Sequence, residues 1–411
     1  MKIFVISSDY PPYHAGGYEL RVKDIVDGLA QRGHEVLVLT TKKSGRGKAD
    51  SRSLPYTVIR KLHDRYHARF FPKEVRNDLM DIAVIDRQIE AFQPDLIYLG
   101  HIYVLTKALI PYLADQALPI VLDEGGASLK GAWTDHGRWF RFTGDYRSRF
   151  GILNRVKPLV INLVCKLSKN RIKKDWSWPE DIRVIFNNQQ NYKRIQALNV
   201  PLDGATVIHS GVDTDKFTFK PKTKIDSPIQ IICPSRIEPR KGQKDAVQLI
   251  YQMKLSGINS RLKFIGPISS EDYYYELNNQ ISQFQIEDFI TFIPMVSQKE
   301  LVDYYHQSDI LFFPSYQKIG FSRTPLEAMA CGCVVISYGN EASDEIIRHG
   351  ENGYLVEQEN LQEVARIIEM LLSSPKKYEE MIDHTRQEIE KRYSLEKYID
   401  QVEETIRSVG A

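Results

Sequence analysis

At 411 residues, the chain is too long for one ordinary hydrophobic core, so its length predicts two domains. Its 42% of hydrophobic and 26% of charged residues are typical of a soluble globular protein. The net charge of +2 excludes a general attraction to nucleic acid or to a membrane, and any such attraction must come from a local patch.

The cysteines and the apolar runs bear on the cellular compartment. Four unevenly placed cysteines give no disulfide framework, and Cys331 and Cys333 lack the usual spacing of zinc ligands. The amino terminus lacks the long apolar region of a signal peptide, and no apolar run approaches the ~20 residues that span a bilayer. We therefore expect a cytoplasmic protein.

The chain opens with the pattern of a strand, a helix and a second strand. Lys2–Ser7 is nearly all apolar, as a strand buried on both faces should be; a helical stretch from 18 to about 31 and the strand Glu35–Thr40 follow. The spacing G-x-G-x-x-G is absent, which argues against hydride transfer with a dinucleotide. Gly16 and Gly17 stand where the loop meets the helix. They favour either a close approach of the backbone to a ligand or a turn that needs positive φ.

Titratable residues follow the next two predicted strands. His101 comes just after Leu96–Leu99, and Asp123 and Glu124 come at the carboxyl end of Pro119–Leu122. Ligand groups in open α/β sheets gather at the carboxyl ends of the strands, so these three side chains are candidates for a catalytic site. For the two carboxylates, solvated loop charges are an equally good explanation.

The segment from 130 to 175 differs from its surroundings in composition. It holds twelve Lys and Arg against three acids, with aromatic residues interleaved. Basic groups mixed with aromatics suit an anionic membrane surface or an anionic acceptor. A solvated helical hairpin explains the pattern equally well, and single-stranded nucleic acid is the weaker alternative.

A second series of strands and helices starts after a polar linker at 216–228. Ile229–Cys233 opens this series, and Arg236 and Lys241 follow directly. A diphosphate leaving group gains negative charge as its bond to a sugar breaks. Two fixed cations at a strand end would stabilise that charge in the transition state.

The stretch Phe313–Val335 is the one around which the chain is organised. A predicted strand, Asp309–Phe313, leads to a helix in whose first turn Pro325 is well suited, because proline has no N–H to lose there. Free amide groups and the positive end of the helix dipole favour an anion, and Glu327 would accept hydrogen bonds from a diol. A diphosphate joined to a ribose matches both features, whereas an ordinary capped βαβ crossover needs no ligand. The loop before the helix contains Gly320, Phe321, Ser322 and Thr324.

The pattern PS-x4-GF-x4-LEAMACG in this stretch resembles the carboxyl-terminal signature of family 4 glycosyltransferases, which are retaining enzymes of the GT-B fold. The resemblance extends over most of the chain. It implies two doubly wound Rossmann-like α/β domains that face a cleft. Residues 1–213 would bind the acceptor and residues 214–393 the nucleotide sugar, with a last helix at about 394–411 crossing back to the first domain. Helical runs are expected at 361–373 and 378–408.

The resemblance also implies roles for particular residues. Arg236 and Lys241 would hold the diphosphate, helped by amides of the loop 320–322, and Glu327 would bind ribose hydroxyls. The pair Asp213 and Asp215 formally makes a D-x-D, but it lies inside the linker signature of the family, so we expect no metal there. The other positions that match the donor site of the family are Gly16, Gly17, Pro294, Met295, Val296, Ile319, Gly320, Phe321, Ser322 and Thr324.

Ile319 departs from the family pattern, which usually has a glutamate eight residues before Glu327. That glutamate accepts hydrogen bonds from hydroxyls of the donor sugar. Three outcomes stay open at this point: backbone groups of 320–322 or the side chains of Gln317 and Lys318 meet the hydroxyls, the sugar lacks a hydroxyl there, or catalysis is lost.

The expected activity is therefore transfer of a hexose, glucose in the first place, from a UDP-sugar to a saccharide or lipid-linked acceptor in polysaccharide or glycoconjugate biosynthesis. Retention at the anomeric carbon, no cofactor, no required metal and no nucleic-acid partner are expected with it. The protein would be cytoplasmic, and it would in addition bind peripherally to the inner face of the membrane through residues 130–175. The alternatives are a nucleotide-binding GT-B protein without transferase activity and a nucleotide-sugar epimerase.

Overall fold

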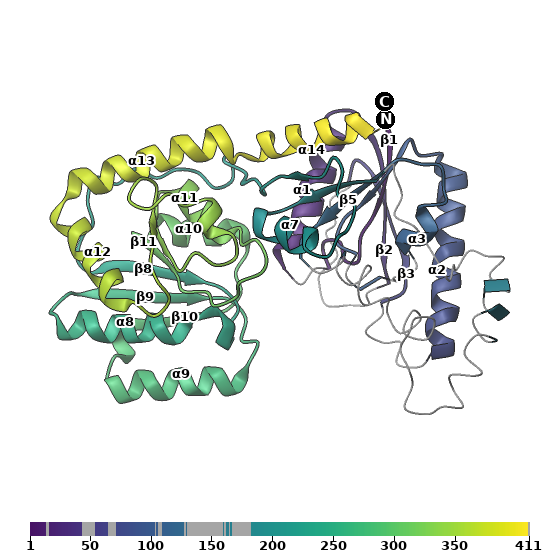
Figure 1. Cartoon of the computed structure of the whole chain (residues 1–411). Helices are drawn as coiled ribbons and strands as arrows, with labels where there is room; N and C mark the ends of the chain where they lie inside the picture. The colour runs from purple at the N-terminus through teal and green to yellow at the C-terminus, as the bar shows by residue number, and fades with distance from the viewer. Residues whose placement is uncertain are drawn as a thin grey trace. The chain divides into compact units, whose positions relative to one another are not determined.

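The computed structural model describes residues 1–13, 16–42, 54–64, 71–102, 104–105, 109–126, 129, 159, 162–163, 165–166 and 182–409. Contacts between Cα atoms divide the chain into two compact units, which are coloured by residue number in Figure 1. Unit 1 is Met1–Ile208 with Ile399–Ala411, and unit 2 is His209–Tyr398. The expectation for 130–175 lies almost entirely outside the described residues and stays a prediction.

Unit 1 is built on a parallel sheet with strand order β3-β2-β1-β4-β5-β6-β7. Its buried strands are nearly continuous apolar runs, as strands covered on both faces must be. The strands are β1 (Lys2–Ile6), β2 (Glu35–Thr41), β3 (Thr57–Leu62), β4 (Leu96–Leu99), β5 (Ile120–Glu124), β6 (Ile182–Phe186) and β7 (Thr206–Val207). In the part of unit 1 that the structure describes, the helices are α1 (Gly17–Gln31), α2 (Phe71–Phe92), α3 (Leu109–Leu113), α7 (Gln189–Gln196) and α14 (Leu395–Val409).

Unit 2 has a second parallel sheet, with strand order β10-β9-β8-β11-β12-β13. The strands are β8 (Ile229–Pro234), β9 (Ser260–Ile265), β10 (Ile290–Ile293), β11 (Ile310–Phe313), β12 (Val334–Ser337) and β13 (Tyr354–Leu355). The helices are α8 (Gln243–Leu255), α9 (Glu271–Phe284), α10 (Gln298–His306), α11 (Thr324–Cys331), α12 (Leu361–Ser373) and α13 (Pro375–Arg392). Two doubly wound Rossmann-like units are thus present, as the sequence predicts.

Local sequence explains where the key helix of unit 2 begins and ends. Pro325 lies in the first turn of α11, as expected, where its missing N–H costs nothing. Gly332 ends the helix in the left-handed region, with φ +89°. The organising stretch is therefore a strand, a loop, a short helix and a strand, in the predicted order.

The carboxyl-terminal helix crosses back to unit 1, as predicted, and lies beside α1 (Figure 1). The predicted single run at 378–408 is wrong, because α13 ends at Arg392 and α14 begins at Leu395. The break has a backbone cause. The Val212 N–H donates to the Tyr393 carbonyl and the Val212 carbonyl accepts from the Leu395 N–H, which takes both groups out of a continuous helix.

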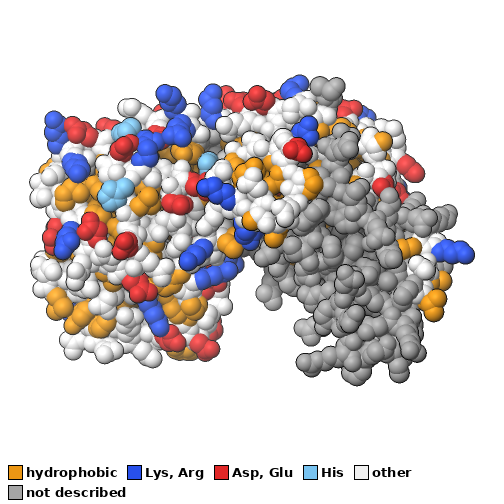
Figure 2. Space-filling view, in the orientation of Figure 1, with side chains coloured by type: hydrophobic (Ala, Val, Ile, Leu, Met, Phe, Trp, Pro, Cys, Tyr) orange, Lys and Arg blue, Asp and Glu red, His pale blue; other side chains and the backbone are white. Residues whose placement is uncertain are grey.

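Among the described residues, no helix is both long and apolar enough to cross a membrane. On the face of the molecule drawn in Figure 2, Lys and Arg side chains are interspersed with Asp and Glu over the described surface, in keeping with the net charge of +2.

Candidate functional site

Unit 2 has a topological switch point between β8 and β11. From β8 the strand order runs one way to β9 and β10 and the other way to β11 and β12. Crossover helices on either side of such a point leave a crevice at the carboxyl ends of the two strands, and ligands of doubly wound sheets bind there. The segments that follow β8 and β11 contain most of the site residues predicted for this unit.

Close backbone approaches hold these two segments together. Gly242 has φ +68°, and a Cβ at this position would lie 1.9 Å from the Pro314 carbonyl oxygen, so no larger residue fits. The Tyr316 N–H donates to the Arg240 carbonyl at 2.9 Å. The short 3₁₀ helix Pro239–Lys241 is therefore fixed against the loop that follows β11.

The two predicted phosphate-binding cations differ in their surroundings. The Arg236 side chain is 43% exposed, and its Nε lies 3.5 Å from Glu238 Oε1. The Lys241 side chain is only 10% exposed, and its Nζ lies 2.5 Å from Glu341 Oε1. One cation is thus open to a ligand, whereas the other is already held by a buried carboxylate that sequence reasoning missed.

The loop between β11 and α11 presents an apolar side chain where the family pattern has a carboxylate. Ile319 is 44% exposed. Gly320 has φ +122°, which favours glycine, and the Gln317 side-chain amide donates to the Ile319 carbonyl at 2.9 Å. The Ser322 N–H donates to the Glu341 carbonyl at 3.2 Å, so this amide is engaged within the protein.

Glu327 lies at the start of α11, beside the loop. Its side chain is mostly buried; Oε2 accepts from the Tyr305 hydroxyl at 3.4 Å, and Oε1 lies 3.7 Å from Arg323 Nε. Burial, together with the negative charge of Glu327, raises the pKa of Tyr305 well above its usual range, so the tyrosine stays a hydrogen-bond donor. These contacts fix the orientation of the carboxylate at the helix N-terminus, and its role toward ribose stays a prediction.

Exposed apolar side chains lie just beyond three strand ends of the same sheet. They are Ile268 after β9, Met295 after β10 and Ile319 after β11. Met295 is 76% exposed and stands between Pro294 and Val296, where we expect the nucleotide base. Apolar surface at the edge where ligands bind suits the flat face of a base.

In unit 1, Asp123 and Glu124 are fully buried, so the alternative of solvated loop charges is wrong. Arg21 donates to both Asp123 oxygens at 3.0 Å, and the Tyr98 hydroxyl donates to Oδ2 at 2.9 Å. Glu124 accepts the Gly126 and Leu129 N–H groups at 2.8 and 2.6 Å. Burial raises the pKa of Glu124, although these two hydrogen bonds work to lower it. The contacts give both carboxylates a structural role, and their catalytic role stays a prediction.

His101 and Gly16 meet at a second switch point, between β1 and β4 of unit 1. Glu19, on the first turn of α1, accepts the Gly16 N–H at 3.0 Å and lies 3.4 Å from His101 Nδ1. Burial works to raise the pKa of Glu19, but the hydrogen bond and charge of His101 outweigh it and hold that pKa below its usual value. Gly16 has φ −167°, an extended value, so the positive-φ explanation is wrong for Gly16.

Sequence reasoning missed Glu19, Arg21 and Glu341. A glutamate three residues after Gly16 has the spacing of a capping box and was the available indication for Glu19. Arg21 and Glu341 reach partners 102 and 100 residues away, so no local pattern indicates them. In the linker, Asp213 Oδ1 accepts the N–H groups of Asp215 and Lys216, which makes it a turn cap.

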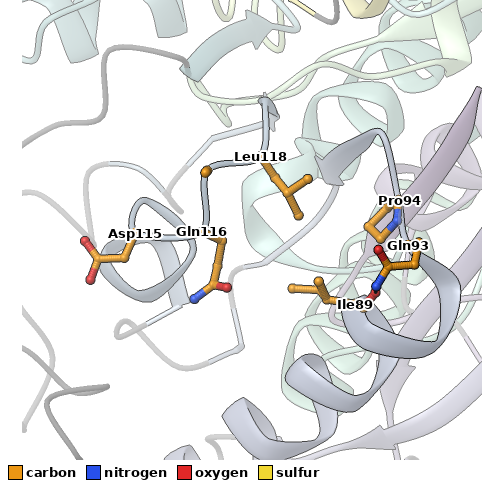
Figure 3. A pocket seen from close by; sticks show the side chains of 7 residues that line it. Ile89, Gln93, Pro94, Asp115, Gln116 and Leu118 are labelled. Atoms are coloured by element: carbon orange, nitrogen blue, oxygen red, sulfur yellow. The ribbon is translucent and has the colours of Figure 1, made fainter.

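A shallow pocket of about 360 Å³ lies at the opposite edge of the unit 1 sheet (Figure 3). Pro94 and Leu118 in its lining come just before β4 and β5, at their amino ends, whereas His101 and Asp123 are at the carboxyl ends. The other lining residues are Ile89, Gln93, Asp115, Gln116 and Ala117. Its place in the fold separates it from the predicted site.

Two family models match the chain. The model described as Glycosyltransferase Family 4 matches residues 15–216, and the model described as Glycosyl transferases group 1 matches residues 215–388. The two matches meet at 215–216, shortly after the division between the units at Ile208 and His209. Together they account for most of unit 1 and nearly all of unit 2.

Relatives with curated descriptions include glycosyltransferases and a glycogen synthase. An uncharacterized glycosyltransferase of Haemophilus influenzae is 32% identical over 34% of this chain and 38% of its own length. Glycogen synthase of Mycobacterium tuberculosis is 22% identical over 91% of this chain and 87% of its own length.

The fold is also that of solved glycosyltransferases. The crystal structure of Anabaena HepE in complex with UDP has a TM-score of 0.70 at 19% identity, over 99% of this chain and 100% of that one. HepE in complex with UDP-glucose gives a TM-score of 0.68 at 18% identity, with the same coverage. At this level of identity the likeness shows the fold alone.

Proposed function

This chain belongs to glycosyltransferase family 4, with the GT-B fold, and on that premise we propose that it transfers a hexosyl group from a UDP-sugar with retention at the anomeric carbon. Glucose is the proposed sugar, and a saccharide or a lipid-linked saccharide the proposed acceptor. The single observation that supports this most is the pair Arg236 and Lys241 at the switch point of unit 2.

These cations act on the leaving group. As the bond between the anomeric carbon and the phosphate oxygen breaks, its electron pair stays on the diphosphate. The acceptor hydroxyl forms the new bond to that carbon on the face that the diphosphate leaves, and its proton passes to the departing phosphate oxygen. Arg236 and Lys241 would stabilise the added charge more in the transition state than in the bound donor, and charge-assisted hydrogen bonds contribute roughly 1.5–3 kcal/mol each.

The two side chains would thus supply the positive charge that a divalent metal supplies in other phosphate chemistry, so we propose that no metal is required. UDP is the proposed nucleotide because HepE, which shares the fold, was crystallised with UDP and with UDP-glucose. A role in polysaccharide or glycoconjugate biosynthesis is proposed from the M. tuberculosis relative, a glycogen synthase.

The test is slow donor hydrolysis without any acceptor, across UDP-, ADP-, GDP- and TDP-linked glucose, with UDP-galactose and UDP-N-acetylglucosamine as further donors. We expect UDP-glucose to be hydrolysed fastest, with or without a chelator. Faster hydrolysis of glucose linked to another nucleotide would overturn the choice of UDP. Loss of activity with the chelator would overturn metal independence.

Ile319 favours one second candidate, a nucleotide-binding protein without transferase activity, because its side chain cannot accept a hydrogen bond. Tight UDP binding without hydrolysis of any donor would support that candidate. Appearance of an epimerised sugar in the same assay would instead identify an epimerase.

A further inference from the structure

Glu341, in the loop after β12, is a buried carboxylate that neither the family pattern nor the predicted site includes. Its side chain is 6% exposed. Oε1 accepts from Lys241 Nζ at 2.5 Å and also from the Ser315 hydroxyl. Within residues 209–398, all of which the structure describes, no side chain and no backbone N–H donates to the other oxygen, Oε2. A carboxylate has about four acceptor positions, so this one has unused capacity inside a mostly buried site.

The backbone around Glu341 is strained. Glu341 has φ +53° and Ala342 has φ +61°, both in the left-handed region that residues other than glycine rarely adopt. Strain of this kind persists only where the surrounding structure enforces it, and it clusters at functional sites. Here the Asn340 side chain donates to the Ser315 carbonyl at 2.6 Å, and the Glu341 carbonyl accepts the Ser322 N–H.

The chemistry of the unused oxygen restricts what it can bind. A phosphate placed against it would be repelled, because both groups are negative. A neutral hydroxyl group donates to a carboxylate without adding charge, and such hydrogen bonds are among the stronger ones in proteins. Lys241 has three N–H donors and gives one to Glu341, so it has others for a phosphate oxygen.

We propose that Glu341 Oε2 accepts hydrogen bonds from hydroxyl groups of the donor sugar, which makes Glu341 a specificity-determining residue. This inference rests on the proposed function. A diphosphate held by Lys241 brings its attached sugar next to Glu341, which thus supplies, from the loop after β12, the acceptor that Ile319 cannot supply from the loop after β11. The pair of Lys241 and Glu341 would then recognise the diphosphate and the sugar together.

The experiment measures binding, so it does not depend on turnover. Dissociation constants of UDP, UDP-glucose and its 2-, 3-, 4- and 6-deoxy analogues are determined by calorimetry for the wild type, Glu341→Gln and Glu341→Ala. We expect the wild type to bind UDP-glucose at least about tenfold more tightly than one of the analogues, because a site built to bond a hydroxyl rejects a ligand that lacks it. Glu341→Ala should lose that preference and still bind UDP. Glu341→Gln, which keeps an acceptor oxygen, should retain part of it.

Glu388→Gln is the matched control. Glu388 is a buried carboxylate of the same unit, on α13, where it pairs with Arg348 and Arg392. Its variant should keep the full preference for the hydroxyl even if it is less stable. An unchanged preference in Glu341→Ala, or no preference in the wild type, would overturn the inference. Absence of donor hydrolysis in the wild type would overturn the proposed function instead.

Discussion

Lys241 and Arg236 have the same predicted role but stand in different environments. Lys241 is buried against Glu341, whereas the Arg236 side chain is 43% exposed and its Nε lies 3.5 Å from Glu238 Oε1. A buried pair holds its lysine in one geometry, while an exposed guanidinium must be ordered when the ligand binds. Lys241 is therefore preorganised toward the leaving group to a greater extent than Arg236.

Lys241→Ala and Arg236→Ala should each lower turnover of the donor by at least about tenfold, because loss of ~1.4 kcal/mol of transition-state stabilisation is a factor of ten. Hydrolysis of UDP-glucose under single-turnover conditions measures this. Lys244→Ala is the matched control, since Lys244 lies on the adjacent first turn of α8, half exposed and paired with Glu276. Near-normal rates in both site variants, with folding verified by circular dichroism, would remove these cations from the mechanism.

Residues of this site were predictable where their role follows from position on an element. Arg236 and Lys241 come directly after a strand, and Glu327 comes in the first turn of a helix. Glu341 was not predictable, because its partner Lys241 lies 100 residues earlier and only the fold brings them together. The burial of Asp123 was not predictable either, because its partner Arg21 is 102 residues away in the sequence. A solvated loop charge was therefore one of the two explanations that the sequence left open.

At the scale of elements, α14 illustrates how charge fixes a helix to its neighbour. Glu403 accepts from Arg32 at 2.7 Å, from Arg407 at 2.6 Å, and lies 3.1 Å from His34 Nε2. Arg32 also pairs with Asp400 at 2.6 Å. Beneath these charges, Gly28 of α1 packs so closely against Ile399 that a Cβ there would lie 2.2 Å from Ile399 Cδ1.

Glu403→Gln should destabilise unit 1 at neutral pH, and this loss of stability should disappear in acid. The hydrogen bonds from Arg32, outweighing burial, lower the pKa of Glu403 from 4.5 to about 2. A carboxyl whose folded pKa is depressed contributes stability that is fully present above its unfolded pKa and is lost as pH falls through the folded one. The contribution should therefore be intact above about pH 4.5 and disappear toward pH 2. Because solvent reaches the network, we expect about 1 kcal/mol at pH 7.

Thermal unfolding of the full chain at pH 7, 4.5 and 3.5 measures the difference between wild type and variant. Glu404→Gln makes the same change at the next residue, which is exposed, and should have little effect at any pH. A difference for Glu403→Gln that stays constant from pH 7 to pH 3.5 would contradict the assigned contacts.

At the scale of the molecule, the architecture could be predicted from the sequence. Apolar runs such as Ile310–Phe313 alternate with helical stretches in two series, and such alternation gives parallel doubly wound sheets. The sequence did not predict β3, because Thr57–Leu62 shows neither a continuous apolar run nor a regular alternation, and only one of its six residues is fully buried. It also missed the break between α13 and α14, because a bridge from Val212 to Ser394 decides it.

If unit 2 activates a UDP-hexose for transfer with retention, the anomer of glucose that is first released from UDP-glucose reports on it. The sugar of UDP-glucose has the α configuration, so ¹H NMR followed from the first minutes, before mutarotation, distinguishes the two outcomes. We expect α-glucose to appear first in the wild-type reaction and its release to be at least about tenfold slower with Lys241→Ala. Release of β-glucose first, or equal release by wild type and variant, would contradict it.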